Sequence, residues 1–292
     1  MKAPIIFMHF EHSWYLEHTL KCAKVFNPDT NIFLFGDDSN KDIAIQSGAI
    51  FDYYEDYNGK GSNFKDLKDN YAHIGSAPKW AYPKHHFNIM RWPRLREIMA
   101  KKRIKSCWYF DSDTIICRDL SEIRLSNLYY IINGISGCVT YVNSIRKLEM
   151  LCSMIYELRK NDDFKNYHKN IIEEKRKVGK LYNLADMSYI REFVNTYFPL
   201  TCDLAYPIQE TNKLSIFDWN INSSIADHIQ DYSYRFEMEN GKKKILFFDK
   251  LPYFLYSDIY NKRIHPIRAN TLNMSWSDPV FFNKVLSNLG LK

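Results

Sequence analysis

Trp108-Tyr109-Phe110-Asp111-Ser112-Asp113-Thr114-Ile115-Ile116 is the most informative stretch of this 292-residue chain. Apolar residues typical of a buried strand flank two aspartates that are one residue apart. Two ionised carboxylates in such a place repel each other and lose hydration unless a positive charge compensates. Paired carboxylates are hard oxygen ligands, so the pattern predicts that Asp111 and Asp113 bind Mg²⁺ or Mn²⁺. A strand-end turn with two exposed aspartates is the alternative interpretation.

The residues upstream of this stretch predict a parallel sheet. An apolar run at 5–10 has the length of a strand, and Ser13 can cap a helix whose apolar positions recur at helical spacing. A second apolar run at 32–35 and a third at 50–54 follow. Apolar strands that alternate with an amphipathic helix indicate a parallel sheet covered on both faces. We therefore expect an α/β fold.

Further helices and strands are expected downstream. Pro93 is expected to open a helix in its first turn, where proline is tolerated, after a long polar and aromatic loop at 57–86. The part of the chain from Thr201 onward is expected to mix short strands and loops. Between these parts, the pattern predicts strands at 128–133 and 137–142 and helices at 144–159, within 161–180 and from Ala185.

Composition excludes several classes of protein. The chain has 40 Lys and Arg against 34 Asp and Glu, 46% hydrophobic residues, and only 10 Gly and 10 Pro. This balance is typical of a compact globular protein and excludes a disordered tail, a collagen-like fibre and a disulfide-stapled miniprotein. The net charge of +6 is spread along the chain, and the basic runs at 101–105 and 242–244 are typical of solvated faces. We therefore expect no nucleic-acid partner.

Cysteine spacing and hydropathy predict the cellular location. The six cysteines form no C-x-x-C pair, which favours a reduced cytosolic setting. No apolar run approaches the roughly 18 residues of a membrane-spanning helix. We expect a cytoplasmic protein, and a peripheral position at the inner face of a membrane is compatible with its positive charge.

The segments around the two aspartates resemble a known enzyme family. Arg91-Trp92-Pro93-Arg94-Leu95, followed by the strand with Asp111-Ser112-Asp113, is similar to the glycosyltransferases of the GT-A fold, which place a metal-binding D-x-D at the end of a central strand. Residues 137–143 resemble the strand that commonly follows in that fold. Residues 185–188 resemble the acidic segment that opens a helix at the sugar and acceptor site, and 264–266 resemble a late histidine that completes the metal site.

This resemblance implies both a fold and a reaction. The implied fold is one GT-A-like α/β domain over 1–292 with a mixed central sheet. A Rossmann-like half at about 1–120 would bind a nucleotide sugar, and an elaborated half at about 121–292 would bind the acceptor. The implied reaction moves a sugar from a nucleotide-diphosphate sugar, UDP-sugar by default, to a glycan or glycolipid, with Mn²⁺ or Mg²⁺ as cofactor. A retaining reaction is favoured, because relatives with a late metal-binding histidine tend to retain.

The resemblance also implies roles for individual residues. Asp111 and Asp113 are expected to bind the metal and, through it, the donor, and His265 is expected to be a further metal ligand. Arg91 stands where the family has an arginine before a helix, near the donor phosphates or base. Asp186 is expected to be catalytic, either by orienting the donor sugar or acceptor hydroxyl or, in an inverting enzyme, as the general base.

Each of these residues also has a structural interpretation. Arg91 could pair with an acidic surface residue, His265 could lie at the surface, and Asp186 could be a helix N-terminal acid favoured by the helix dipole. Asp38 follows the second expected strand and is a further candidate for holding the nucleoside of the donor.

Two other functions remain open on the sequence. Phosphohydrolases of the haloacid-dehalogenase type also end a strand with D-x-D, and residues 36–42 match their later acid motif, although here that motif precedes the D-x-D. The other alternative is an inactive protein that binds a sugar nucleotide or a glycan. The chain has no G-x-G-x-x-G, no Walker sequence, no H-E-x-x-H and no G-x-S-x-G, which leaves dinucleotide oxidoreductases, P-loop kinases, zinc proteases and serine hydrolases unsupported.

Overall fold

The computed structural model describes most of the chain. The described residues are 2–57, 73–123, 137–180, 182–197, 208–209, 214–224, 234–258, 263–275 and 277–291. The strands of these segments form two larger sheets and one small two-stranded ribbon.

The first sheet has five strands and carries the fold expected from the sequence. Its strands are β1 (Ile5–Met8), β2 (Ile32–Gly36), β3 (Ile50–Tyr53), β4 (Cys107–Asp111) and β6 (Val139–Val142). Their order is β3-β2-β1-β4-β6, with the first four strands parallel and β6 antiparallel to β4. The predicted β-α-β unit, the α/β class and the mixed central sheet are therefore confirmed.

Helices cover both faces of the first sheet. They are α1 (Leu16–Phe26), α2 (Lys41–Gln46), α4 (Tyr82–Lys101), α5 (Ile145–Lys160) and α7 (Asp186–Tyr197), and α6 (Asp162–Lys177) packs against α5. The predicted helices at 144–159, within 161–180 and from Ala185 are confirmed, and the expected strand at 128–133 lies outside the described residues. None of the described helices combines the length and hydropathy that a membrane span requires.

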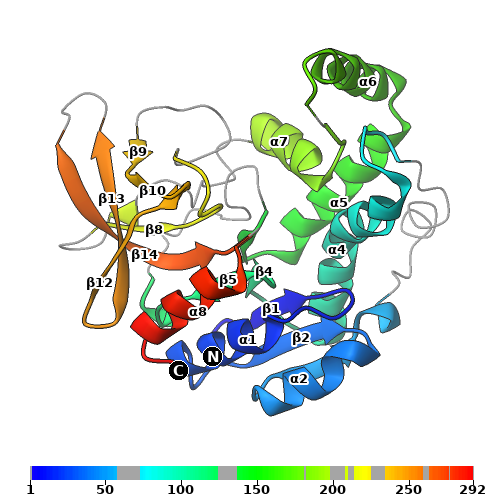
Figure 1. Ribbon diagram of the computed structural model, residues 1–292. Helices are drawn as coiled ribbons and strands as arrows, with labels where there is room; N and C mark the ends of the chain where they lie inside the picture. Colours follow the sequence, from blue (N-terminus) through cyan, green and yellow to red (C-terminus); the bar gives the residue numbers. More distant parts are fainter. Residues whose placement is uncertain are drawn as a thin grey trace.

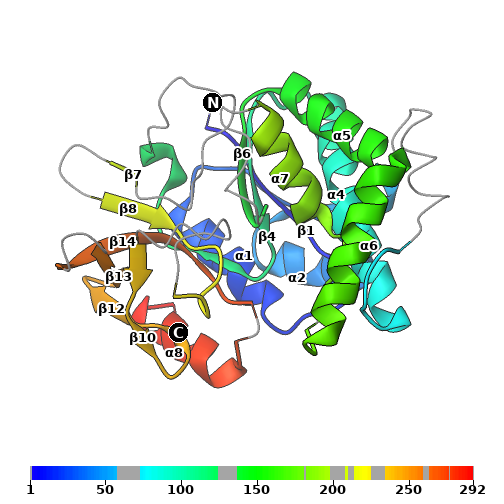
Figure 2. The same cartoon turned by 90° about the horizontal axis from the view of Figure 1, so that it is seen from above.

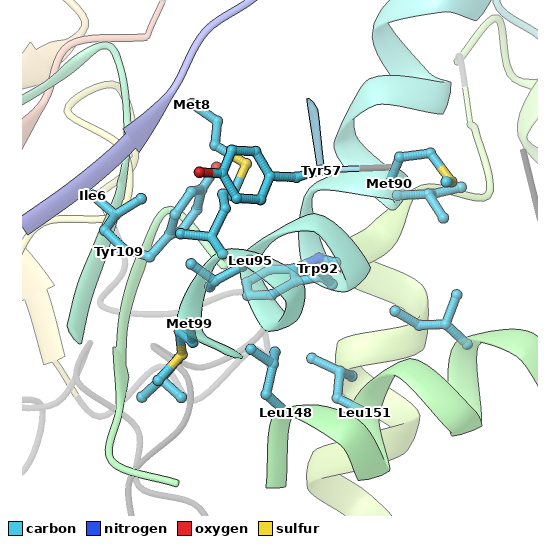
Figure 3. Packing of buried hydrophobic residues seen from close by; sticks show 14 of the residues in the cluster. Ile6, Met8, Tyr57, Met90, Trp92, Leu95, Met99, Tyr109, Leu148 and Leu151 are labelled. Atoms are coloured by element: carbon cyan, nitrogen blue, oxygen red, sulfur yellow. The ribbon is translucent and has the colours of Figure 1, made fainter. Parts of the chain in front are cut away.

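The strands are apolar along their whole length because each face packs against helices. In β1, Ile5 and Phe7 belong to a core shared with α1, whereas Ile6 and Met8 belong to a core shared with α4, α5 and α7. In this second core, Trp92 of α4 is fully buried beside the strands (Figure 3). Full burial of such a side chain contributes about 1.5–3 kcal/mol, so this core fixes α4 on the sheet.

Two helix starts differ from the sequence prediction. The N-cap of α1 is Tyr15, and Ser13 contributes only its backbone carbonyl, to the amide of Leu16. Pro93 lies in the interior of α4 and does not open it; the helix begins at Tyr82, with Pro83 in the first turn. A proline is favoured at a first turn but costs a backbone hydrogen bond in an interior, and here the buried face of α4 offsets that cost.

Most strands of the second sheet come from the C-terminal part of the chain. Its longest strands are the antiparallel pair β13 (Leu251–Asp258) and β14 (Ile264–Asn273), of eight and ten residues, where the sequence predicted only short strands. The helix α8 (Pro279–Asn288), which the sequence prediction missed, packs beside it. The strands are β5 (Thr114–Ile116), β7 (Ile208–Gln209), β8 (Leu214–Phe217), β9 (Tyr234–Phe236), β12 (Ile245–Phe248), β13 (Leu251–Asp258) and β14 (Ile264–Asn273), and the small ribbon is β10 (Met238–Glu239) with β11 (Lys242–Lys243).

The two sheets meet at the turn that carries the aspartates. β5 follows β4 after two residues and pairs with the end of β14, so that Thr114 lies opposite Asn273. Figure 1 and Figure 2 both show the β12–β14 sheet on one side of the molecule and α5–α7 on the other. Ser112 and Asp113, between β4 and β5, therefore lie at the junction of the two halves of the fold.

A buried ion pair fixes the end of β14 near this junction. The ammonium of Lys243 donates to Oδ1 of Asp218 at 2.5 Å, and both side chains are almost completely buried. Oδ2 of Asp218 accepts from the amide of Asn273 at 2.9 Å. The prediction that the basic run at 242–244 is a solvated face is therefore wrong for Lys243, which also contacts the ring of Phe236.

Candidate functional site

The two aspartates lie at the carboxyl edge of the first sheet. Asp111 is the last residue of β4 and lies beside Met8, the last residue of β1. Asp113 follows in the turn, where its backbone carbonyl accepts from the amide of Met274. In open α/β sheets this edge is where ligands bind. The structure thus places both predicted metal ligands where the fold favours a site.

One carboxylate oxygen of Asp113 accepts a hydrogen bond, and the other has no partner among the described residues. Its Oδ2 accepts a hydrogen bond of 2.7 Å from the hydroxyl of Ser275, just after β14. Its Oδ1 is buried and has no hydrogen-bond partner among the described residues. Burial raises the pKa of Asp113, although the Ser275 bond and the charge of Lys84 oppose this. A buried carboxylate oxygen without a partner is costly, which points to a missing cation or donor.

Arg91 joins Asp111 to Asp186. Its Nη1 donates to Oδ1 of Asp111 at 2.5 Å, and its Nη2 donates to Oδ2 of Asp186. The indole of Trp92 donates to the same oxygen of Asp186 at 3.2 Å. Burial disfavours the charged guanidinium, but the two carboxylates outweigh it and raise the pKa of Arg91. The bridge therefore fixes β4, α4 and the start of α7 relative to one another.

Charge is unbalanced around this bridge. Asp111, Asp113 and Asp186 carry three negative charges when ionised, against the single positive charge of Arg91, which leaves an excess of two beside the exposed Lys84, whose charge also acts on Asp113. Burial raises the pKa of Asp111 to about 7, with Arg91 opposing the effect and Asp113 adding to it. The side chain of Asp111 is nevertheless 30% exposed, so a ligand can reach it. A divalent cation has the charge that would balance this cluster.

Arg91 and Asp186 occupy structural positions. Arg91 lies in the middle of α4 and not before it, it is only 5% exposed, and both of its Nη atoms bind carboxylates. Asp186 is the first residue of α7 and is 2% exposed. Asp186 begins α7, as its structural interpretation expected. Arg91 is in an ion pair, but its partner Asp186 is buried and does not lie at the surface. Each residue also contacts the site through the bridge.

The structure does not bring His265 to the aspartates. His265 lies near the start of β14, exposed, opposite Tyr256 of β13. It is the other end of β14, at Asn273, that reaches the junction. The eight residue steps from His265 to Asn273 span about 25 Å of extended strand, too far for a shared ion. The expectation that His265 completes the metal site is therefore wrong for this structure.

Another histidine lies at the site instead. His9 follows β1, is 6% exposed, and its Nδ1 lies 2.7 Å from the hydroxyl of Ser112, between the two aspartates. Burial lowers the pKa of His9 to about 4, so its imidazole is neutral at physiological pH. Its Nε2 is buried without a hydrogen-bond partner among the described residues. A signal was present in the sequence, because a polar residue directly after β1 must lie at the carboxyl edge beside β4.

Lys84 and His85 stand at the start of α4 near the same edge. The charge of Lys84 acts on His9, His85 and Asp113, in each case lowering the pKa. The charge of Asp186 acts on His85 in the opposite direction. These residues lie in the segment 57–86 that the sequence assigned to a loop, of which 58–72 lie outside the described residues.

Asp38 lies two strands away from the aspartates at the same edge. It follows β2, is exposed, and accepts a hydrogen bond of 3.0 Å from the hydroxyl of Tyr53. Its neighbour Asp37 caps the short helical turn of Asp38–Asn40. The string at 36–42 that matches the acid motif of a phosphohydrolase is thus a helix cap followed by α2.

Some solved glycosyltransferases are similar to this chain at low identity. Mouse xyloside xylosyltransferase 1 in its apo form matches with a TM-score of 0.42 and 12% identity, over 70% of this chain and 86% of that one. The PaToxG glycosyltransferase matches with a TM-score of 0.41 and 13% identity, over 68% of this chain and 69% of that one. The apo form of the glycosyltransferase GlyE of Streptococcus pneumoniae TIGR4 matches with a TM-score of 0.36 and 14% identity, over 67% of this chain and 44% of that one.

Sequence comparisons add nothing to these structures. No protein-family model matches the chain, and no curated protein matches it either. Each TM-score is below 0.5, so what this chain does has to be inferred from the side chains of its own site.

The donor atoms at the site fit a partly hydrated divalent ion. Among the described residues, no three side chains of His, Cys, Asp or Glu are arranged to hold a metal together. Mg²⁺ and similar ions are commonly bound by one or two carboxylates plus the phosphates of a substrate and water. Asp111 and Asp113 supply such a pair, and the unpartnered Oδ1 of Asp113 is the oxygen that most needs a cation.

Proposed function

We propose that this protein is a metal-dependent glycosyltransferase that uses a nucleotide-diphosphate sugar. One observation carries the proposal: two neighbouring carboxylates lie at the carboxyl end of a central strand, and one of their oxygens, Oδ1 of Asp113, is buried without a partner. Negative charge is in excess at this edge of an α/β sheet. It suits a cation that binds together with an anionic ligand.

Asp111 and Asp113 are the residues that would hold Mn²⁺ or Mg²⁺. When bound, such an ion offers positive charge to the diphosphate that leaves the sugar. The protein contributes preorganisation: Arg91 fixes Asp111, and Ser275 fixes Asp113, before any ligand arrives. Groups that need not reorganise during the reaction stabilise the transition state most effectively.

Asp186 acts on the reaction through Arg91. Its Oδ2 already accepts from Arg91 and Trp92, so it is a positioning residue and a poor general base. A retaining transfer needs no dedicated base, and this arrangement favours it. The donor is a UDP-sugar by default, with Asp38 near its nucleoside, and the acceptor is a glycan or glycolipid met in the cytoplasm or at a membrane surface.

Thermal stability against a panel of nucleotide diphosphates, with and without Mn²⁺, tests the proposal. A ligand at 100 times its dissociation constant adds about 2.7 kcal/mol to the folded state, which is readily seen. We expect stabilisation by UDP or another nucleotide diphosphate that requires Mn²⁺. No nucleotide effect, together with Mg²⁺-dependent hydrolysis of a generic phosphate ester, would instead identify a phosphohydrolase. Nucleotide binding without hydrolysis or transfer of any donor sugar would identify an inactive binding protein.

A further inference from the structure

His9 is a buried polar side chain that the proposed function does not use. Its backbone amide donates to the carbonyl of Phe35 in β2, and its ring lies edge-on to Tyr15 at 6.0 Å between centroids. Its Nδ1 contacts the hydroxyl of Ser112. Phe35 thus holds the backbone of His9, Tyr15 and Ser112 contact its ring, and Nε2 is left as a buried nitrogen without a partner among the described residues. Such an atom calls for a ligand.

The charges around His9 are mixed: the carboxylate of Asp37 raises its pKa, whereas the charges of Lys84 and His12 lower it. Lys84, in the first turn of α4, is exposed, and its charge reaches both His9 and Asp113. His9 is not arranged with the aspartates as a joint metal site. A neutral imidazole whose Nδ1 accepts from Ser112 carries its proton on Nε2 and donates there. A donor and a nearby ammonium beside a metal site suit the phosphate oxygens that the metal does not hold.

We propose that His9 Nε2 and the ammonium of Lys84 bind the diphosphate of the donor, in the role that the sequence assigned to Arg91. This inference rests on the proposed function, because it needs a diphosphate held beside Asp111 and Asp113. Both Nη atoms of Arg91 bind carboxylates, which leaves only its buried Nε without a partner, whereas His9 Nε2 has no partner among the described residues and Lys84 is exposed.

Calorimetric titration of the full chain with inorganic pyrophosphate at saturating Mn²⁺ tests this inference. Pyrophosphate carries the phosphate oxygens without a nucleoside, so it isolates the contact in question. We expect His9→Leu to weaken pyrophosphate binding by about tenfold or more, as for the loss of a hydrogen bond to a charged group. His9→Gln keeps a donor close to the position of Nε2, and we expect it to restore most of the affinity. Mn²⁺ alone should bind both variants as it binds the unaltered protein.

Lys84→Gln is the second variant and does not touch the core. We expect it to weaken pyrophosphate binding by about threefold, as for an exposed charge. Lys79→Gln is its matched control, since Lys79 is an exposed lysine five residues earlier with no described effect on the site. If His9→Leu lowers the thermal midpoint so far that it cannot be titrated, Lys84→Gln and His9→Gln decide the question.

Several results would overturn the inference. One is unchanged pyrophosphate binding in His9→Leu and Lys84→Gln. Another is a loss of affinity for Mn²⁺ alone in His9→Leu that is as large as its loss of affinity for pyrophosphate, which would make His9 a metal ligand. A third is weakened UDP binding with intact pyrophosphate binding, which would place His9 at the nucleoside. If the unaltered protein binds Mn²⁺ but neither pyrophosphate nor any nucleotide diphosphate, the proposed function itself fails, and this outcome is distinct from the others.

Discussion

Ser275 donates a hydrogen bond of 2.7 Å to Asp113, which lies 162 positions earlier in the chain. The bond occupies Oδ2 and so determines which oxygen of the carboxylate remains open. It also crosses from the second sheet to the first, because Ser275 follows β14 and Asp113 follows β4. The geometry of the candidate metal site therefore depends on how the two sheets are joined.

Removing this hydroxyl should weaken metal binding. In Ser275→Ala, Asp113 can rotate, and we expect Mn²⁺ affinity to fall by about tenfold, as when a group that supports a metal ligand is lost. Calorimetry or the paramagnetic signal of free Mn²⁺ measures this. Ser287→Ala, at an exposed position of α8, is the matched control and should bind Mn²⁺ normally. Equal affinity in both variants would contradict the role given to Ser275.

Neutralising Asp113 should abolish function without unfolding the protein. Burial raises the pKa of this carboxyl, so its charge is unfavourable in the metal-free protein. We expect Asp113→Asn to lose Mn²⁺ binding and sugar transfer while its thermal midpoint without metal is equal or higher. Asp29→Asn, at a side chain that is 80% exposed, is the control for charge alone. Normal turnover in Asp113→Asn would refute the metal site.

The metal should bind more tightly as the pH rises toward neutrality. The pKa of Asp111 is about 7 in the folded protein against an ordinary value of 3.8, so the folded state holds a proton that the unfolded state releases. The stability of the metal-free protein should therefore fall as pH rises from about 4 to about 7, since the unfolded state binds fewer protons there. Mn²⁺ competes with that proton, so its affinity should rise over the same interval. Thermal midpoints with chelator and with Mn²⁺, measured from pH 5 to 8, check both trends; parallel curves would contradict them.

Gly137 should resist substitution because of what it touches. Its φ is +63°, and an added Cβ would lie 2.8 Å from the ring of Trp92 and 3.3 Å from Nη2 of Arg91. Gly179 has nearly the same φ, +67°, but nothing within 4 Å of an added Cβ. Gly179→Ala should cost about 1–2 kcal/mol through backbone strain alone. Gly137→Ala should cost about 1–3 kcal/mol more through overpacking, and should also weaken Mn²⁺ binding through Arg91. Equal losses of unfolding free energy in Gly137→Ala and Gly179→Ala, measured by urea unfolding, would refute the contact.

Breaking the ion pair between Lys243 and Asp218 should destabilise the fold strongly. Lys243→Met leaves a buried carboxylate without its partner, and we expect a loss of about 3–5 kcal/mol in urea unfolding. Asp218→Asn in the same chain removes the orphaned charge and keeps an acceptor for the amide of Asn273. The double variant should therefore recover most of the loss. A double variant as unstable as the single one would show that the charge is not the cause.

Local patterns in the sequence predicted the first half of the fold well. The strands β1 to β4 and the helix between β1 and β2 show the apolar runs and the helical spacing that neighbours in the chain can produce on their own. Pro93 misled the prediction because a proline signals a helix start, whereas tertiary packing holds it inside α4. The start of α8 was readable, since Asp278 caps it and Pro279 follows, but it lies among strands that mask its pattern.

The site was predicted only where it is local in sequence. Asp111 and Asp113 are adjacent on one strand and its turn, so their position followed from the strand itself. His265 was misplaced because the direction of β14, and hence which of its ends meets β5, is decided by pairing across 150 residues and more. Ser275 was missed for the same reason. His9 was within reach, because it directly follows the first apolar run.

The order in which a ribosome makes these residues has a consequence for the cell. A nascent chain that has just completed β13 already contains both aspartates, His9, Arg91 and Asp186, but not the hydroxyl of Ser275. Such a chain contains all strands of the first sheet, yet it lacks the hydrogen bond that holds Asp113 in its final orientation. A chain that ends before β14 therefore contains the aspartates of the candidate site but lacks the hydroxyl that orients Asp113.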